Sequence, residues 1–333
     1  MKKILIVVII NLFFILPAYS TKIAVLKELT KPETLCLDES QYYITEGVSV
    51  WIYSLRDHKL VGKFGKAGEG PREFKATPGG YGLRVFPLPD QLLVNSFDKL
   101  SFFNKKGEFS REIKVPMGVY QPRGEKFVGL AFQAGADQSM AITVNLFNEK
   151  LEKGKEIYSR TLLQRGSMVF PVASPIFEAR NGRIFIGGEE EFVIRILDAE
   201  GNPLSSIARD YKRIKVTEEY KQGVFEAFKK NPVTKGMVDY LKQMIKFKEY
   251  FPAILSIFID GAHIYIQTYR KQQEKYEIFI YDTNGKYLKQ VYLPIQYVDM
   301  IQPYPFAIKN GILFQLIENE ENEVWELYAN EIK

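Results

Sequence analysis

Short apolar runs recur along this chain in a fixed order: an apolar strand, a polar loop, a second apolar strand and a tight turn. The order is clearest at residues 183–186 and 192–197, which the turn at residues 198–201 follows. It returns at residues 263–266 and 276–281, before a similar turn at residues 282–285. A unit that repeats about every 40–50 residues indicates a repeat architecture, and four-stranded units of this size are typical of β-propeller blades.

Six such units can be aligned, so the sequence predicts an all-β fold, a six-bladed β-propeller. The paired strands are expected at residues 41–45 and 48–53, 91–94 and 100–103, 126–130 and 141–147, 183–186 and 192–197, 263–266 and 276–281, and 311–316 and 324–328. The sixth unit ends about one strand short, and residues 22–27 supply a strand that can complete it. Closure of this kind hides sheet edges that would otherwise pair with other chains.

The strand pattern disappears between residues 217 and 250. Thr217 can cap a helix, and the acidic residues 218–219 that follow favour the positive end of its dipole. Tyr220, Val224 and Phe228 then fall on one helical face, and a second helix is expected near residues 238–245. We interpret residues 217–250 as a helical hairpin that is inserted between blades four and five and covers the loop-rich face.

The first twenty residues have the features of a secretory signal peptide. Lys2 and Lys3 precede an apolar run over residues 4–16, and Ala18 and Ser20 are small enough for a cleavage site. The alternative is a membrane anchor, but the run is shorter than the roughly 20 residues that cross a bilayer. We therefore predict a signal peptide over residues 1–20, one propeller domain over residues 21–333, and a secreted or periplasmic location.

Charge and cysteine content add two expectations. The formal net charge of +5 includes Lys2 and Lys3, which belong to the predicted signal peptide. So small an excess gives no reason to expect a nucleic-acid partner, which requires a clustered basic stripe. Cys36 is the only cysteine, so no disulfide forms within the chain and the hydrophobic core must supply the stability. We expect a monomer.

One segment resembles a known family. Residues 64–74 read Phe-Gly-Lys-Ala-Gly-Glu-Gly-Pro-Arg-Glu-Phe, and this resembles the loop of NHL-type six-bladed propellers, in which a glycine-rich turn ends in Gly-Pro-x-Glu-Phe. Arg72 stands where that family commonly has glycine. Residues 251–254 and 260–261 are similar to secreted bacterial members of the same broad group. The resemblance implies the fold and says little about chemistry, because one fold hosts many activities.

Several catalytic and cofactor sites can be set aside. The glycines of residues 65–70 have the wrong order for a dinucleotide fingerprint, and no Gly-Lys-Ser/Thr follows them. His58 and His263 lie in no His-Glu-x-x-His motif, and a single cysteine cannot complete the usual zinc ligand sets. No serine lies in Gly-x-Ser-x-Gly. The sequence therefore predicts no catalytic residue and no cofactor.

Acidic side chains occupy the same loop of several units. Glu46, Asp98, Glu189 and Glu190 lie in this loop of the first, second and fourth units, and residues 318–323 lie in that of the sixth. Equivalent loops of a propeller gather around one end of the channel, where carboxylates can bind calcium through six to eight oxygens. The alternative is that these acids are solvated loop residues. A calcium-dependent propeller hydrolase or lactonase is the alternative function.

The fifth unit is basic instead. We place Tyr269 and Arg270 in its loop, and the helical segment beside it is rich in lysine. A basic, partly covered sector can attract an anionic sugar, a peptide or an acidic partner; the alternative is a solvated lysine-rich surface. We therefore predict an exported binding scaffold rather than an enzyme. Its partner is a protein, peptide or carbohydrate, and its candidate ligand-binding residues are Glu46, Asp98, Glu189, Glu190, Tyr269 and Arg270.

Overall fold

The middle strands of each sheet are apolar on both faces because neighbouring sheets cover both faces. The computed structural model describes residues 20–75, 82–96, 98–135, 139–164, 167–171, 176–187 and 190–333; the predicted signal peptide lies outside them except for Ser20. In β3 (Gln41–Glu46) the four central residues are buried without a break. The outer strand β20 (Pro203–Ala208) buries only Ile207. Unbroken apolar runs therefore mark the middle strands.

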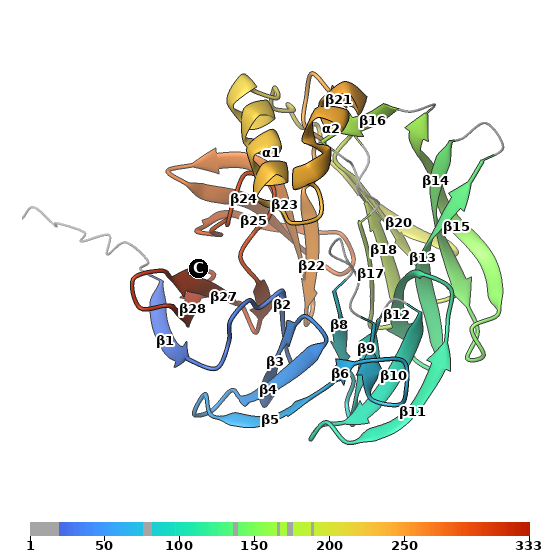
Figure 1. Cartoon of the computed structure of the whole chain (residues 1–333). Coiled ribbons are helices and arrows are strands. Elements are labelled where there is room, and N and C mark those ends of the chain that lie inside the picture. Colours follow the sequence, from blue (N-terminus) through green and yellow to red (C-terminus); the bar gives the residue numbers. More distant parts are fainter. Residues whose placement is uncertain are drawn as a thin grey trace, which may run out of the picture.

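Six sheets surround a central axis (Figure 1). The first contains β2 (Thr34–Leu37), β3, β4 (Ser49–Ser54) and β5 (Leu60–Phe64). The second contains β8 (Arg84–Pro87), β9 (Gln91–Asn95), β10 (Lys99–Asn104) and β11 (Phe109–Lys114). The third contains β12 (Gly118–Arg123), β13 (Lys126–Ala134), β14 (Met140–Phe147), β15 (Lys153–Gln164), β16 (Ser167–Phe170) and β21 (Ile245–Phe247).

The other three sheets continue the ring. The fourth contains β17 (Ile176–Arg180), β18 (Arg183–Gly187), β19 (Val193–Leu197) and β20. The fifth contains β22 (Ser256–Asp260), β23 (His263–Gln272), β24 (Lys275–Asp282) and β25 (Tyr287–Leu293). The sixth contains β26 (Phe306–Lys309), β27 (Ile312–Asn319), β28 (Val324–Glu331) and β1 (Thr21–Leu26). The six-bladed propeller is confirmed.

The ring closes through the amino-terminal strand. β1 runs antiparallel to β28 at the outer edge of the sixth sheet, as predicted for residues 22–27. Leu26 is buried in a core shared by the sixth and first sheets, with Tyr42 and Trp325. Lys22 Nζ lies 3.0 Å from Glu326 Oε1. A further hydrophobic cluster fills each of the other five junctions between neighbouring sheets, so the described residues pack all six junctions.

The segment that resembles NHL-type propellers forms a compact link between the first two sheets. Its ends pair in parallel as β6 (Lys66–Ala67) and β7 (Glu73–Phe74), and Gly70 N donates to Glu73 Oε2 at 2.9 Å. Arg72 has a φ of 66°, a left-handed conformation that glycine adopts without strain. Glycine would therefore fit this position with less backbone strain than arginine.

Gly65 is the most constrained glycine of this link. Its φ is +91°, and an added Cβ would lie 2.3 Å from the carbonyl oxygen of Val48. Gly47 has a φ of +55° with no atom within 4 Å of such a Cβ, so it is a matched control. We expect Gly65→Ala to lower the free energy of unfolding by about 3 kcal/mol and Gly47→Ala by about 1 kcal/mol. Urea unfolding of both variants measures the difference, and equal losses would contradict the steric argument.

The helical residues follow β20 and precede β22 in the chain. They form α1 (Glu218–Lys230), η1 (Lys235–Met237) and α2 (Val238–Met244), and Figure 1 shows them together at the top of the view. Thr217 caps α1, because its side chain accepts from Tyr220 N at 3.1 Å. After α2 the chain enters the third sheet as β21, which pairs in parallel with β16. The helices are therefore anchored to the third sheet as well as to their neighbours in the chain.

One expectation about the fifth sheet is wrong. Tyr269 and Arg270 were expected in a loop, but β23 extends to Gln272 and β24 begins at Lys275. The turn is therefore very short, and Gln273 and Glu274 both have positive φ values, 48° and 60°, as a tight hairpin turn requires. The polar side chains at the end of β23 project from a strand, which holds them more rigidly than a loop would.

Candidate functional site

A cavity of about 1170 Å³ opens where α1 meets the fourth and fifth sheets. Its walls come from α1, from the ends of β23 and β24, and from the segments that enter and leave the fifth sheet. The lining residues are Phe170, Pro171, Ile176, Lys212, Arg213, Ile214, Thr217, Glu219, Tyr220, Phe251, Ile254, Leu255, Tyr269, Arg270, Lys271, Glu274, Tyr276, Tyr297, Met300 and Ile301. We call this space the helix-covered cavity.

Aromatic rings form one wall of the helix-covered cavity. Tyr269 stacks on Phe251 with ring centroids 4.4 Å apart. Phe251 in turn meets the edge of Tyr220 at 4.7 Å, so residues from β23, the segment before β22 and α1 share one cluster. Tyr276 stacks on Tyr297 at 5.0 Å. Burial, with Tyr220 and Tyr297 nearby, raises the pKa of Tyr269, so its hydroxyl stays neutral and can donate or accept a hydrogen bond.

Arg270 is held in place by a buried carboxylate. Its Nε lies 3.8 Å from Glu277 Oε1, and its Nη2 donates to the backbone oxygen of Lys212 at 3.0 Å. Glu277 is only 3% exposed, and it accepts hydrogen bonds from Tyr211 at 3.0 Å, Thr268 at 2.8 Å and Gln290 at 2.9 Å. The guanidinium of Arg270 also lies over the Tyr211 ring, 5.2 Å from its centroid. This network orients Arg270 before any ligand arrives.

Two further cations line the same space. Lys271 Nζ lies 4.7 Å from the centroid of Tyr276 and 3.6 Å from Glu274, which is 92% exposed. An ion pair so open to water contributes little, so Lys271 remains available to a ligand. Lys212 is exposed. Together with Arg213 and Arg270, these lysines give the lining four cationic side chains against the two carboxylates of Glu219 and Glu274.

Glu190 lies beside the helix-covered cavity and holds two basic residues. Lys248 Nζ donates to Glu190 Oε1 at 2.8 Å, and Arg213 Nη1 donates to Glu190 Oε2 at 2.9 Å. The hydrogen bond from Lys248, supported by Arg213, lowers the pKa of Glu190. The structure thus brings Glu190, Tyr269 and Arg270 to one cavity, the tyrosine and arginine in its lining and the glutamate through Arg213. Glu189 lies outside the described residues.

Glu46 and Asp98 lie outside this cavity, and each forms hydrogen bonds or ion pairs with residues close to it. Glu46 accepts from the backbone nitrogens of Thr30 at 2.6 Å and Lys31 at 2.5 Å, and from Trp51 Nε1 at 3.1 Å. Asp98 Oδ2 lies 2.7 Å from Lys75 Nζ. Neither residue lines the helix-covered cavity. Both carboxylates therefore hold connections between strands in place.

No group of three or more histidine, cysteine, aspartate or glutamate side chains is placed to hold a metal ion within the part of the chain that the structure describes. Because the nearby acids already pair with Arg213, Lys248 and Lys75, we predict that calcium does not bind. The melting temperature of the protein should change by less than about 1 °C on adding either 1 mM calcium or a chelator. A calcium-dependent rise of several degrees would instead favour the hydrolase alternative.

Several site residues were not selected from the sequence. The aromatic lining residues Phe251, Tyr276 and Tyr297 are far apart in the chain, and Tyr220 was interpreted only as part of a helical face. Glu277 did leave a signal, because it interrupts the apolar run of β24 and is the only carboxylate among the six buried central residues of that strand. A buried charge in such a run requires partners, and these partners include Arg270.

Comparison with known proteins supports the fold. No family model matches the chain, and no curated protein matches its sequence. A member of the DUF4221 family from Bacteroides vulgatus ATCC 8482 has a similar structure, with a TM-score of 0.52 and 10% identity, over 94% of this chain and 97% of that one. A candidate exported protein from Bacteroides fragilis NCTC 9343 aligns with a TM-score of 0.48 and 10% identity, over 93% and 95% of the two chains.

A luciferin-regenerating enzyme also aligns, with a TM-score of 0.44 and 12% identity, over 94% of this chain and 95% of that one. Likeness at these levels concerns the arrangement of sheets and carries no argument about activity. Within the described residues, none of the helices is both long enough and apolar enough to cross a bilayer.

Proposed function

We propose that this chain is an exported binding protein and that its ligand occupies the helix-covered cavity. The observation that carries this proposal is one large cavity that combines stacked aromatic walls with oriented cations. Ligand sites are typically apolar clefts with a few well-placed polar groups. The aromatic pairs at Tyr269 and Tyr276 supply the apolar surface, and Arg270 supplies a polar group that its neighbours already hold in position.

The lining favours an acidic oligosaccharide over other ligands. The apolar C–H face of a sugar ring can lie on an aromatic ring, whose face is electronegative. A carboxylate or sulfate on that sugar can then approach Arg270, Lys271 or Lys212. With Arg213, the lining has four cationic side chains and only two acidic ones. The volume of about 1170 Å³ is at or above the upper end of ordinary small-molecule pockets. We therefore propose a ligand of two or more sugar units.

The helices complete this site. We interpret α1 and α2 as an insertion between blades four and five, and their position after β20 and before β22 supports this. Tyr220 of α1 reaches the aromatic cluster. Gly223 of α1 faces Met300, which an added Cβ would meet at 3.0 Å, so the helix approaches the segment after the fifth sheet closely. The helices thereby supply one wall of the cavity.

A thermal-shift comparison tests the proposal. The probes are trigalacturonate and a sulfated trisaccharide, with neutral cellotriose and the acidic peptide triglutamate as comparisons. We expect at least one acidic sugar to raise the melting temperature by about 5 °C at 100 times its dissociation constant, and cellotriose to act more weakly. Binding of triglutamate alone would replace the saccharide with an acidic peptide. No shift with any probe would contradict a ligand site of this chemistry.

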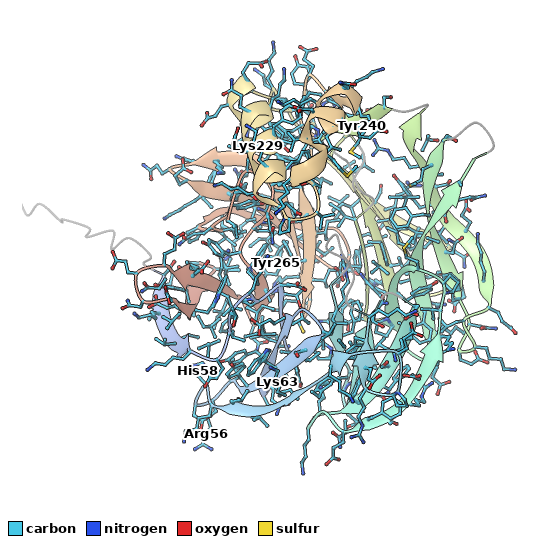
Figure 2. The ribbon with its side chains drawn as sticks, viewed as in Figure 1. Arg56, His58, Lys63, Lys229, Tyr240 and Tyr265 are labelled. Carbon is cyan, nitrogen blue, oxygen red and sulfur yellow. The ribbon has the colours of Figure 1, made fainter. Side chains whose placement is uncertain are left out.

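The double variant Lys212→Ala/Lys271→Ala separates the contribution of charge to ligand binding from the contribution of shape. Both side chains are exposed or weakly paired, so the fold should survive. The double variant should lose most of the shift caused by the acidic sugar and little of any shift caused by cellotriose. Arg56→Ala is the matched control, because Arg56 is an exposed turn residue of the first sheet, far from the helices in Figure 2.

We further propose that residues 1–20 direct export, that the mature protein works as a monomer in the periplasm or outside the cell, and that it belongs to the NHL-like group. The charged and apolar order of residues 2–16 supports the first point. The second rests on the closed ring, which leaves no junction for exchange with another chain. The third rests on residues 64–74. Amino-terminal sequencing of the protein from the cell envelope tests export, with cleavage after residue 20 expected.

A further inference from the structure

A second cavity, of about 730 Å³, lies at the other end of the inner strands β2, β8, β12, β17, β22 and β26. Each of the six turns that follow these strands contributes to its lining, which includes residues 38–40, 87–89, 122–124, 180–182, 261 and 309. The cavity therefore lies on the axis of the ring. We call it the axial cavity.

The axial cavity is separate from the helix-covered cavity. The strand β17 connects them, because its first residue, Ile176, lines the helix-covered cavity and its last, Arg180, lines the axial one. A strand of five residues places its ends about 13 Å apart. The two cavities consequently open at opposite ends of the propeller, and a variant in one should leave the other unchanged.

Most charges around the axial cavity are already paired. Asp38 Oδ2 lies 2.7 Å from Lys105 Nζ, and burial of Asp38 is outweighed by hydrogen bonds from Lys105 and Tyr43, which lower its pKa to about 2. Lys309 Nζ lies 2.5 Å from Glu39 and 3.9 Å from Asp260. Arg123 donates to the backbone oxygen of Ala199. Burial raises the pKa of the nearby Cys36 thiol to about 12, so it stays neutral.

Three charges remain without a direct partner. Glu178 and Arg180 lie two residues apart on β17, so they share one face of the strand. Arg84, on β8 of the second sheet, interacts electrostatically with Glu178 across the intervening third sheet. Within the described ranges, none of these three side chains makes a hydrogen bond or an ion pair within 4 Å. Glu178 and Arg180 both line the axial cavity, whereas Arg84 lies outside its lining and acts on Glu178 only through its charge.

Near neutral pH, the carboxyl group of Glu178 can be either protonated or ionised. Burial raises its pKa to about 7, although Arg180 and Arg84 oppose this rise. A bound anion beside Glu178 would repel the carboxylate and favour the protonated form, which can donate a hydrogen bond to the anion. Arg180, which lines the cavity, would then supply charge-assisted hydrogen bonds to the anion.

We infer that the axial cavity is a second binding site, which takes a small carboxylate at Arg180, beside Glu178. This site goes beyond the proposed saccharide site and does not depend on it. A hydroxy-carboxylate suits the volume of about 730 Å³ and the many backbone groups of the six turns. An inorganic oxyanion shares the same chemistry, so the test includes one of each.

Isothermal titration calorimetry with gluconate and with sulfate, at pH 6 and pH 8, tests this inference. Both probes keep a constant charge over this range, so any pH dependence arises from the protein. If only the protonated form of Glu178 binds, affinity at pH 6 should exceed that at pH 8 by about tenfold. Glucitol, a neutral analogue of gluconate, should not bind. Tighter binding of gluconate identifies a carboxylate, and tighter binding of sulfate would overturn the carboxylate assignment.

Two substitutions identify the residues. Glu178→Gln keeps a neutral donor, so binding should persist and its pH dependence should disappear. Arg180→Ala should weaken binding at least tenfold at both pH values, whereas Arg56→Ala should leave it unchanged. No saturable binding of either anion at pH 6 at concentrations up to about 10 mM would overturn the inference. An unchanged pH dependence in Glu178→Gln would also overturn it.

Discussion

Replacing Glu277 by alanine is expected to lower the free energy of unfolding by about 3 kcal/mol, because three hydrogen-bond donors lose the buried carboxylate that accepts from them. Glu277 is the common acceptor of Tyr211, Thr268 and Gln290 and lies beside Arg270. All four groups lose their shared partner in the variant. Glu277→Gln retains an amide oxygen and the side-chain volume, so its loss should be smaller.

Glu274→Ala is the matched control for this prediction. Glu274 precedes the same strand but is largely exposed, so its removal should change stability by no more than about 0.5 kcal/mol. Urea unfolding followed by circular dichroism measures all three variants. Comparable losses in Glu277→Ala and Glu274→Ala would show that the buried network does not hold the end of β23. The orientation of Arg270 toward the helix-covered cavity would then need another cause.

The closing strand carries the second large effect. Leu26 is 1% exposed at the junction of the sixth and first sheets, whereas its neighbour Val25 is 44% exposed on the same strand. Leu26→Ala should cost about 2–5 kcal/mol, because the cavity it leaves cannot fully collapse. Val25→Ala should cost about 0.5 kcal/mol or less. Comparing Leu26→Ala with Val25→Ala by thermal or urea unfolding separates the effect of burial on stability from that of strand propensity.

Deletion of residues 21–26 from the mature protein extends this test to the whole strand. The deletion exposes the edge of β28, and an exposed strand edge pairs readily with another chain. We expect the shortened protein to melt at a lower temperature and to associate on size-exclusion chromatography. A shortened protein that stays monomeric and melts at the temperature of the full chain would contradict the role of β1 in closure.

The six-unit architecture could be predicted because burial on both faces leaves unbroken apolar runs in the middle strands. Residues 41–45 and 183–186 can therefore be recognised as strands from the sequence alone, without knowing which strands they pair with. The positions at which strands end were harder to predict from the sequence. Tyr269 and Arg270 extend β23, yet amphipathic residues at a strand end resemble those of a loop. The pairing of β21 with β16 joins two short segments and leaves almost no local pattern.

The site was harder to predict than the fold. Tyr269, Arg270 and Glu190 were chosen from the sequence as separate candidates, one from an acidic loop and two from a basic one. The structure places Tyr269 and Arg270 on β23 in the lining of the helix-covered cavity, and Glu190 beside it through Arg213. Glu46 and Asp98 come from the equivalent acidic loops of other units, but hydrogen bonds with Trp51 and an ion pair with Lys75 engage them locally. The helix-covered cavity combines residues from 170 to 301, and only the folded ring brings these segments together.

The central claim is that the aromatic wall of the helix-covered cavity binds an acidic sugar. Isothermal titration calorimetry of the better acidic probe from the thermal-shift comparison, with wild-type protein, Tyr269→Ala and Tyr240→Ala, tests it most directly. Tyr240 is 57% exposed on α2 and lies outside the cavity lining, and Figure 2 shows it on the helical pair. We predict that Tyr269→Ala weakens binding about tenfold or more, a loss of about 1.4 kcal/mol, while Tyr240→Ala binds as the wild type does. Equal affinities for all three proteins would contradict the account.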